Sequence, residues 1–331
     1  MAATSRVRGA IHYNLRTCSK GGPRYGWRVS PAEHHRPHLA LVLRTAAALL
    51  VATMFMLGKL ANQRGVALPE VMFWRQAVTL PMLIGWLAWH RGLHRLATTR
   101  LQSHAMRAFS GTTGMALNFG AAMLLHLSEA TTLNFTAPLF AVLITALVVR
   151  EHVGPWRWTA VAFGFLGVLL IARPGSTPLP ALGAACGLLA ALFNAVISFQ
   201  IRDLSRTEEP IRVVFWFAAF GTAIAGVMLP FVFHAHDGAT WAILLAIGVI
   251  GTLAQLLMTA ALRFGAVASV IVMDYTQLLW ATLYGRLIWG DLPAATIWLG
   301  APLIVVAGLV IAWREHVLSR QPLHAAMAEA E

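Results

Sequence analysis

"EATTLNFTAPLFAVLITALVVRE" at residues 129–151 and "SVIVMDYTQLLWATLYGRLIWGD" at residues 269–291 decide the fold of this chain. The two stretches align at an offset of 140 residues, and both end in an acid. Each is followed by a second apolar run that contains glycine: "WRWTAVAFGFLGVLLIARPG" at 156–175 and "ATIWLGAPLIVVAGLVIAWRE" at 295–315. Similarity at a fixed separation indicates that one structural unit is present twice in the chain.

The composition of the whole chain indicates which solvent surrounds these stretches. The sequence is 58% hydrophobic and 11% charged, with a mean hydropathy of +0.67, whereas soluble domains are about 45–50% apolar and about 25% charged. The chain is therefore a membrane protein, and its membrane spans must be helices because lipid offers the backbone no hydrogen-bond partners. Ten stretches are long enough to cross a bilayer: residues 39–60, 71–89, 105–125, 130–149, 156–172, 180–201, 211–233, 241–263, 267–289 and 295–313.

Ten spans and one duplication predict two units of five helices. Because five is odd, the second unit enters the membrane from the opposite side, and inverted repeats of this kind place a binding site where they meet. We therefore predict an all-α membrane protein with ten transmembrane helices arranged as two inverted five-helix repeats. The predicted segments are a basic, disordered tail at 1–38, a first repeat at 39–173, a second repeat at 174–316 and a C-terminal tail at 317–331.

The distribution of basic residues predicts the orientation. If the amino terminus is cytoplasmic, nineteen of the 25 Lys and Arg fall in cytoplasmic segments and only Arg64 and Arg173 in outside loops, which is the usual bias of membrane proteins. We expect a plasma (inner) membrane protein with both termini in the cytoplasm. The net charge of +12 then reflects topology and contact with the lipid bilayer rather than a nucleic-acid partner. A homodimer is compatible with this sequence.

The chain resembles the EamA-type branch of the drug/metabolite transporter superfamily from about residue 40 to about residue 316. The resemblance is carried by "PLFAVLITALVVRE" at 138–151, "RWTAVAFGFLGVLLIARPG" at 157–175 and "DYTQLLWATLYGRLIWGD" at 274–291. It implies a secondary carrier of small metabolites that works by alternating access. "LSRTEEP" at 204–210 and the start of the 274–291 stretch are similar to a subgroup of S-adenosylmethionine and riboflavin importers. Members of this family commonly have a proline in the corresponding helix of the second half. This chain has Leu278 at that position, whereas the first half has Pro138.

Asp274 is the leading candidate for a functional residue. Its position within the predicted span places it about 10 Å deep, where a carboxylate costs about 2.5–3.5 kcal/mol and must face protein or a water-filled cavity. Gln277, Ala281 and Tyr284 continue the same helical face, within about 80°. The functional interpretation is that Asp274 binds a cationic part of the cargo or carries a coupling proton. A structural ion pair or a protonated carboxyl is the alternative. We expect Asp274→Asn to abolish or uncouple transport without lowering membrane abundance.

Further candidates follow from position and chemistry. Arg75 is the strongest partner for Asp274 in the first half; it can contact an anion, pair at a gate or extend to the headgroups. Asn134 is a candidate because the repeat superposes it on Asp274. Aromatic side chains near the presumed cavity can stack on a planar or cationic ligand or simply pack: Trp74, Phe135, Tyr275, Trp280 and Tyr284. The other basic residues within spans are interpreted as membrane-boundary anchors: Arg44, Lys59 and Arg286.

Several classes of activity are disfavoured by missing patterns. The sequence has no G-x-x-x-x-G-K-S/T loop for ATP hydrolysis, and no H-E-x-x-H, G-x-S-x-G or paired intramembrane carboxylates for an enzyme. Rings of charge that would suggest a channel are absent as well. Cys18 and Cys186 predict no disulfide, and the histidine stretches at 34–38 and 234–237 lack partners for a metal. We predict a secondary transporter without cofactor or metal; a membrane-embedded enzyme or a channel remains the alternative.

Overall fold

The structure is a computed structural model that describes residues 37–151, 153–172, 179–205, 207–264 and 272–328. The predicted tail at 1–38 lies almost entirely outside the described residues. All regular secondary structure in the described ranges is helical. The elements are α1 (Pro37–Gln63), α2 (Leu68–Trp89), η1 (Leu93–Leu96), α3 (Leu101–Leu124), α4 (Leu127–Asn134), α5 (Ala137–Ile144), η2 (Thr145–Val149), α6 (Pro155–Ala172), α7 (Ala181–Leu204), α8 (Pro210–Val232), α9 (Gly238–Phe264), η3 (Met273–Tyr275), α11 (Thr276–Tyr284), η4 (Gly285–Trp289) and α12 (Ala295–Ala328).

The protein is an all-α membrane protein, as the composition predicts. Within the described residues, eight helical segments are long and apolar enough to cross a membrane, with α4, α5 and η2 together forming one of them. The other two predicted spans are α3 and the segment at 272–289, both of which carry charged side chains. The last span, Ala295–Arg314, agrees with the predicted 295–313, and helix α12 itself continues to Ala328.

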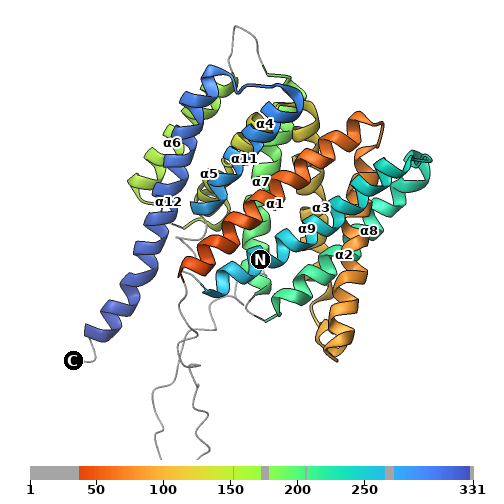
Figure 1. Cartoon of the computed structure of the whole chain (residues 1–331). Coiled ribbons are helices and arrows are strands. Elements are labelled where there is room, and N and C mark those ends of the chain that lie inside the picture. Colours follow the sequence, from red (N-terminus) through yellow and green to blue (C-terminus); the bar gives the residue numbers. More distant parts are fainter. Residues whose placement is uncertain (1–36, 152, 173–178, 206, 265–271, 329–331) are drawn as a thin grey trace, which may run out of the picture. The chain divides into compact units, whose positions relative to one another are not determined.

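The contacts between helices show that the two halves are related by an approximate two-fold axis. α1 packs on α9 and α3 on α7, so the first helix of each half contacts the third helix of the other half. α2 and α8, α4 and α11, and α6 and α12 are paired in the same way across the halves, and Figure 1 shows α6 beside α12 at one edge of the helical body. With α3 and the segment at 272–289 counted as spans, each half crosses the membrane five times, and equivalent halves with an odd number of crossings are inverted.

The duplicated stretches share their irregularities. In the first half the helix breaks between Asn134 and Ala137, and Pro138 lies in the first turn of α5, where a missing backbone N–H costs nothing. In the second half the 3-10 turn η3 takes the place of that break. Both stretches end in a π-helical turn, η2 or η4, followed by a left-handed residue: Arg150 (φ 60°) or Gly290 (φ 71°). The offset of 140 therefore holds for backbone conformation as well as for sequence.

Glycine allows α6 and α12 to approach closely. A Cβ added to Gly167 would lie 2.7 Å from the carbonyl oxygen of Gly300, and one added to Gly300 would lie 2.6 Å from that of Gly167. Because both obstacles are backbone atoms, no side-chain rotation relieves the clash. Gly167 and Gly300 are therefore packing residues of this helix pair.

We expect Gly300→Ala to lower the free energy of unfolding by about 1–3 kcal/mol, the range for overpacking a tight contact. The measurement is thermal or denaturant unfolding of the purified protein in detergent. Gly85→Ala in α2 is the matched control, since a Cβ at Gly85 meets nothing within 4 Å and the higher helix propensity of alanine should stabilise by about 0.5–1 kcal/mol. Equal stability of the two variants would contradict the close contact.

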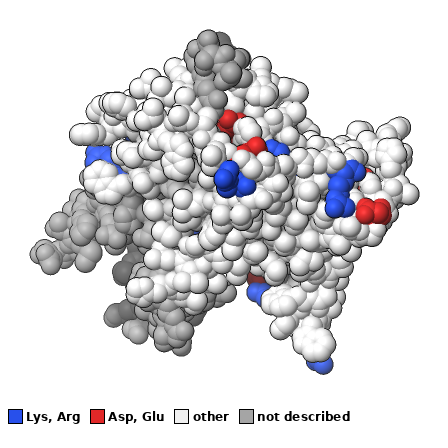
Figure 2. Space-filling model, turned by 45° about the horizontal axis from the view of Figure 1, so that its top comes forward, with Lys and Arg blue, Asp and Glu red and all other residues white. Residues whose placement is uncertain are grey.

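Most of the surface suits a lipid environment. On the side shown in Figure 2, Lys, Arg, Asp and Glu side chains are confined to a few small clusters, with a largely uncharged surface between them. We call the membrane face at which α1 begins the first face, and the face at which α1 ends the second face. The ends of all other spans are assigned to these faces by alternation along the chain.

Candidate functional site

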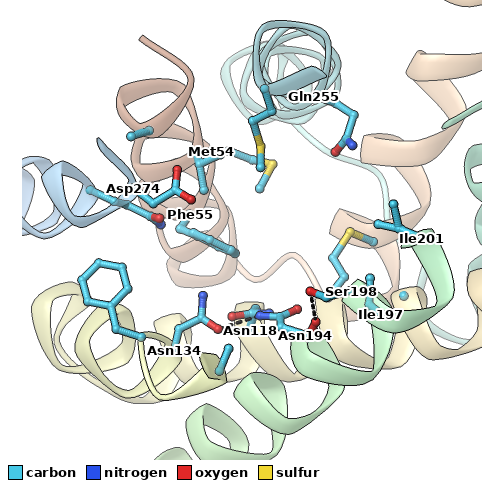
Figure 3. A pocket seen from close by; sticks show the side chains of 18 of the residues that line it. Met54, Phe55, Asn118, Asn134, Asn194, Ile197, Ser198, Ile201, Gln255 and Asp274 are labelled. Atoms are coloured by element: carbon cyan, nitrogen blue, oxygen red, sulfur yellow. Dashed lines mark hydrogen bonds between the residues drawn. The ribbon is translucent and has the colours of Figure 1, made fainter. Parts of the chain in front are cut away.

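A cavity of about 440 Å³ lies between the two halves, within the usual size range of small-molecule sites. Its wall is built from α1, α2, α3, α4, α5, α7, α8, α9, η3 and α11, so both repeats contribute to it. Figure 3 shows side chains converging on this space from opposite sides, with Asp274 facing Gln255 across it. The polar wall residues include Arg75, Arg107, Asn118, Asn134, Asn194, Ser198, Gln255, Asp274 and Gln277.

Asp274 points into this cavity and is bound by Arg44. The Nε and Nη2 atoms of Arg44 donate to the two carboxylate oxygens of Asp274, each at 2.5 Å. The Arg44 side chain is 7% exposed and that of Asp274 35%. This bidentate geometry is the strongest form of Arg–carboxylate pairing.

This ion pair corrects two interpretations of the sequence. Arg44 is a buried partner and not a membrane-boundary anchor, and the partner of Asp274 is not Arg75. The reason is topological: α1 and η3 start at the same face and pack together, which brings Arg44 and Asp274 to one depth. Arg75 lies on α2, which enters from the other face.

Asn134, which the repeat superposes on Asp274, also pairs across the halves. Its Oδ1 accepts a hydrogen bond of 2.6 Å from Nδ2 of Asn194 on α7. Asn118, Asn134 and Asn194 lie together along one side of the cavity in Figure 3. The repeat-related residues Asn134 and Asp274 therefore each contact the first helix of the other half: Asn134 contacts α7, and Asp274 contacts α1.

Phe135 and Tyr275, the next pair of repeat-related residues, contact each other directly. Their rings are edge to face with centroids 4.9 Å apart. Gly308 leaves room for this arrangement, because a Cβ there would lie 2.1 Å from the Tyr275 hydroxyl oxygen. Two equivalent residues can touch only close to the symmetry axis, so the axis passes between these rings at the cavity wall.

Two arginines also line the cavity. The guanidinium carbons of Arg75 and Arg107 lie 5.7 Å and 4.4 Å from the centre of the Phe217 ring. Arg75 also donates a hydrogen bond of 2.8 Å to Oε1 of Gln76, while Arg107 is only 6% exposed. Arg107 is one of the nineteen basic residues that the sequence places in cytoplasmic segments; in the structure it lines the cavity.

One sequence signal could have identified Arg107. Arg107, Gly111, Met115 and Asn118 recur every three or four residues along α3, and all of them line the cavity. This spacing defines one helical face that carries a charge, a glycine and an amide. Phe217 and Asn194 had no comparable signal, because single aromatic or amide residues in a span usually only pack against other helices.

Six of the nine candidate residues line the cavity: Arg75, Asn134, Phe135, Asp274, Tyr275 and Gln277. The other three lie outside the described wall. Trp74 packs edge to face on Trp241 at 4.9 Å, the Tyr284 hydroxyl is 2.7 Å from that of Thr53 on α1, and Trp280 keeps a buried indole N–H without a partner. Tyr284 and Trp280 lie further along α11 than Gln277, nearer the second face.

The cavity is closed towards the second face. Between the cavity and that face, Leu127 and Ala130 of α4 are buried and leave a void of only about 10 Å³. Three contacts join the helix ends at the face itself: Lys59 Nζ donates to the Leu125 carbonyl at 2.6 Å, Trp289 Nε1 donates to Gln63 Oε1 at 2.9 Å, and His126 Nδ1 lies 2.7 Å from Asp291 Oδ2. We call these contacts the second-face closure. Lys59 is thus part of a specific contact, not simply an anchor; Arg286 is exposed and contacts the Gly290 carbonyl.

The corresponding part of the first face lacks such a closure among the described residues. Arg202 and Glu151 line one surface pocket there, and both side chains are exposed. Among the described residues, no hydrogen bond or ion pair joins them. The wall of the central cavity reaches Ile201, in the last turn of α7 at this face.

A separate network on the first face holds the α7–α8 loop against the start of α3. Glu208 accepts hydrogen bonds from Arg212 at 2.6 Å and from Thr98 at 2.8 Å. Burial alone would raise the pKa of the Glu208 carboxyl, but these two hydrogen bonds and the Arg212 charge outweigh burial and lower that pKa below its ordinary value. This loop is therefore firmly attached, and the opening on the first face lies elsewhere.

Comparison with known proteins identifies related chains. Residues 38–173 and 181–313 each match the EamA-like transporter family. A riboflavin transporter of Rhizobium johnstonii is 31% identical over 70% of this chain and 76% of its own. A pseudopaline exporter of Pseudomonas aeruginosa is 30% identical over 80% of this chain and 94% of its own. A riboflavin transporter of Vibrio cholerae is 27% identical over 87% of this chain and 97% of its own.

A solved structure supports the same fold. A crystal structure with 19% sequence identity superposes with a TM-score of 0.55 and covers 84% of this chain and 98% of its own. At this identity the likeness concerns the arrangement of the helices alone.

Proposed function

Because the chain belongs to the EamA-like transporter family, we propose that its central cavity is the substrate site of a carrier that opens to one membrane face at a time. The protein is a multi-pass membrane transporter of small metabolites and not an enzyme. The observation that carries the proposal is the cavity between the inverted halves, closed at the second face and reaching towards the first.

The inverted symmetry supplies a mechanism for alternating access. Counted from the start of each family match, Lys59 and Arg202 occupy the same position, and Asp291 and Glu151 are related by the offset of 140. Lys59 and Asp291 of the second-face closure therefore have counterparts on the first face. When the two halves exchange conformations, Arg202 and Glu151 come to close the first face while the second face opens.

We assign the first face to the cytoplasm of a cell bounded by its plasma membrane, with both termini on that side. The excess of Arg and Lys in segments that connect at this face supports the assignment. Fusion of reporters that are active on only one side of the membrane, placed at both ends of the chain, tests it. The apolar lipid-facing surface also allows two copies to associate as a homodimer, which light scattering of the purified protein tests.

Asp274 is the coupling group in this proposal. The carboxylate lies on the cavity wall and is held by a single basic side chain, Arg44. A proton or a cationic group of the substrate can compete with Arg44 for it, which links occupancy of the cavity to the contact between α1 and η3. Asn134, Phe135, Tyr275 and Gln277 line the same space and provide hydrogen bonds and ring surfaces to the substrate.

The test is uptake by purified protein reconstituted in liposomes. We expect flux that saturates with concentration and is accelerated by unlabelled substrate inside the vesicles, the behaviour of a carrier with one alternating site. Riboflavin belongs in the first panel because two relatives are riboflavin transporters. Flux that rises linearly with concentration, or conversion of the compound during passage, would contradict the proposal.

A further inference from the structure

We infer that Arg75 and Arg107 form a subsite that binds an anionic group, a carboxylate or a phosphate, of the transported molecule. The inference rests on the proposed role of the cavity as the substrate site and adds the chemical class of the substrate. Both arginines line the cavity, and both contact the ring of Phe217.

The first argument is that these guanidinium groups lack partners. Nε of Arg75 and both Nε and Nη1 of Arg107 are enclosed by protein without a hydrogen bond, and Nη2 of neither arginine bonds to a described residue. Buried donors of a charged group are costly unless an acceptor satisfies them. Arg75 contacts one amide oxygen of Gln76, which is neutral, so the positive charge of each arginine remains uncompensated by the described residues.

The second argument concerns the rest of the wall. Among the described wall residues the one carboxylate is that of Asp274, and Arg44 already binds both of its oxygens. The charges of this pair cancel, which leaves the cavity with two net positive charges from Arg75 and Arg107. A low-dielectric space with one sign of charge attracts ligands of the other sign.

The third argument is that the arginines are held in place before any ligand arrives. The Phe217 ring supports both guanidinium groups, with Arg107 at 4.4 Å, a distance typical of cation–π contact. Gly111 provides the space for Arg107, since a Cβ there would lie 2.1 Å from Nη1 and 2.7 Å from the Phe217 ring. Two fixed planar forks suit the paired oxygens of a carboxylate or phosphate.

The size of the cavity indicates an organic ion. A volume of about 440 Å³ greatly exceeds that of an inorganic anion, and Asn134 and Asn194 line the same cavity. A molecule bound at Arg75 and Arg107 through its anionic group can therefore extend an uncharged polar portion towards the asparagines. The substrate class is an organic anion of metabolite size.

The test uses thermal unfolding of the purified full-length protein in detergent at constant ionic strength. Citrate and inorganic phosphate are the anionic probes, and glycerol is the uncharged one. We expect a saturable rise in the unfolding temperature with at least one anion and none with glycerol, because a ligand that binds the folded state stabilises it. Arg107→Gln and Arg75→Gln should each weaken the apparent affinity at least about thirtyfold, the effect of removing one partner of a buried charge pair.

Two controls make the outcome decisive. Arg64→Gln, at an exposed arginine outside the cavity, should keep the response of the parent protein. Without anions, Arg107→Met should unfold at a higher temperature than the parent, because it removes an uncompensated buried charge. No response of the parent to either anion would overturn the inference, and a lower unfolding temperature of Arg107→Met would then assign the arginine a structural role.

The inference and the proposed function can fail separately. Saturable uptake in liposomes without any anion-dependent stabilisation would refute the anionic subsite and leave the carrier intact. Anion-dependent stabilisation that is lost in both Arg75→Gln and Arg107→Gln would support the subsite. That result would stand even if liposome flux proved linear and refuted the carrier.

Discussion

Asp274→Asn is expected to abolish transport, and to lower the amount of folded protein as well. The amide carries no negative charge, so it can neither neutralise Arg44 nor bind a proton in place of Arg44. Because the Arg44 side chain is 7% exposed, the variant leaves a buried cation unpaired, which costs about 3–5 kcal/mol. The sequence alone led us to expect unchanged abundance; the ion pair changes that part of the expectation.

The double variant Arg44→Gln, Asp274→Asn separates folding from function. It removes both charges together, so we expect it to fold close to the parent level but to remain inactive. Uptake in liposomes and the unfolding temperature are measured for the two single variants and the double variant. Asp237→Asn is the matched control, because this exposed carboxylate lies in the α8–α9 loop. Normal uptake by the double variant would exclude the Arg44–Asp274 pair from the mechanism.

Lys59→Gln and Arg202→Gln are expected to shift the resting protein in opposite directions. Lys59→Gln removes the charged hydrogen bond of the second-face closure, so the second face should open more often. Arg202→Gln removes the basic residue that corresponds to Lys59 on the first face. This variant should favour the state in which the second face is closed. A charged hydrogen bond contributes about 1.5–3 kcal/mol, which corresponds to roughly a tenfold to hundredfold change in the ratio of the two states.

A thiol in the cavity measures this ratio. Ser198 lines the cavity and is exposed, and Ser198→Cys hardly changes its volume; Cys18→Ala and Cys186→Ala remove the native thiols. A membrane-impermeant thiol reagent should label this protein quickly from the first face and slowly from the second. Lys59→Gln should raise labelling from the second face, and Arg202→Gln should lower it. Parallel changes in both variants would contradict the exchange of closures between the faces.

The sequence predicted those features that are repeated or that depend on the solvent. The spans follow from apolar length, and eight of them are confirmed within the described residues. The inversion follows from the prediction of five spans in each copy. The cavity-facing position of Asp274 follows from the cost of a charge in lipid. Even the helix break could be predicted, because Pro138 cannot donate the backbone hydrogen bond that a continuous helix needs.

The sequence did not predict which helices would be neighbours. Arg44 and Asp274 are far apart in the chain, and nothing in either span indicates that α1 packs beside η3. The same limit applies to Arg107, which lies only two residues inside its predicted span and therefore looked like a boundary residue. Tyr284 lies on the helical face of Asp274, but that face continues past the cavity into the packed region near the second face, which helical periodicity cannot reveal.

The contact between Phe135 and Tyr275 has a consequence for the motion. Points on the two-fold axis stay in place when the two halves exchange conformations. This pair of rings should therefore remain fixed while the helices on either side of it rotate. Spin labels placed near these rings would then report a nearly constant separation throughout turnover, while labels at the rims beside Lys59 and Trp289 would swing apart and together.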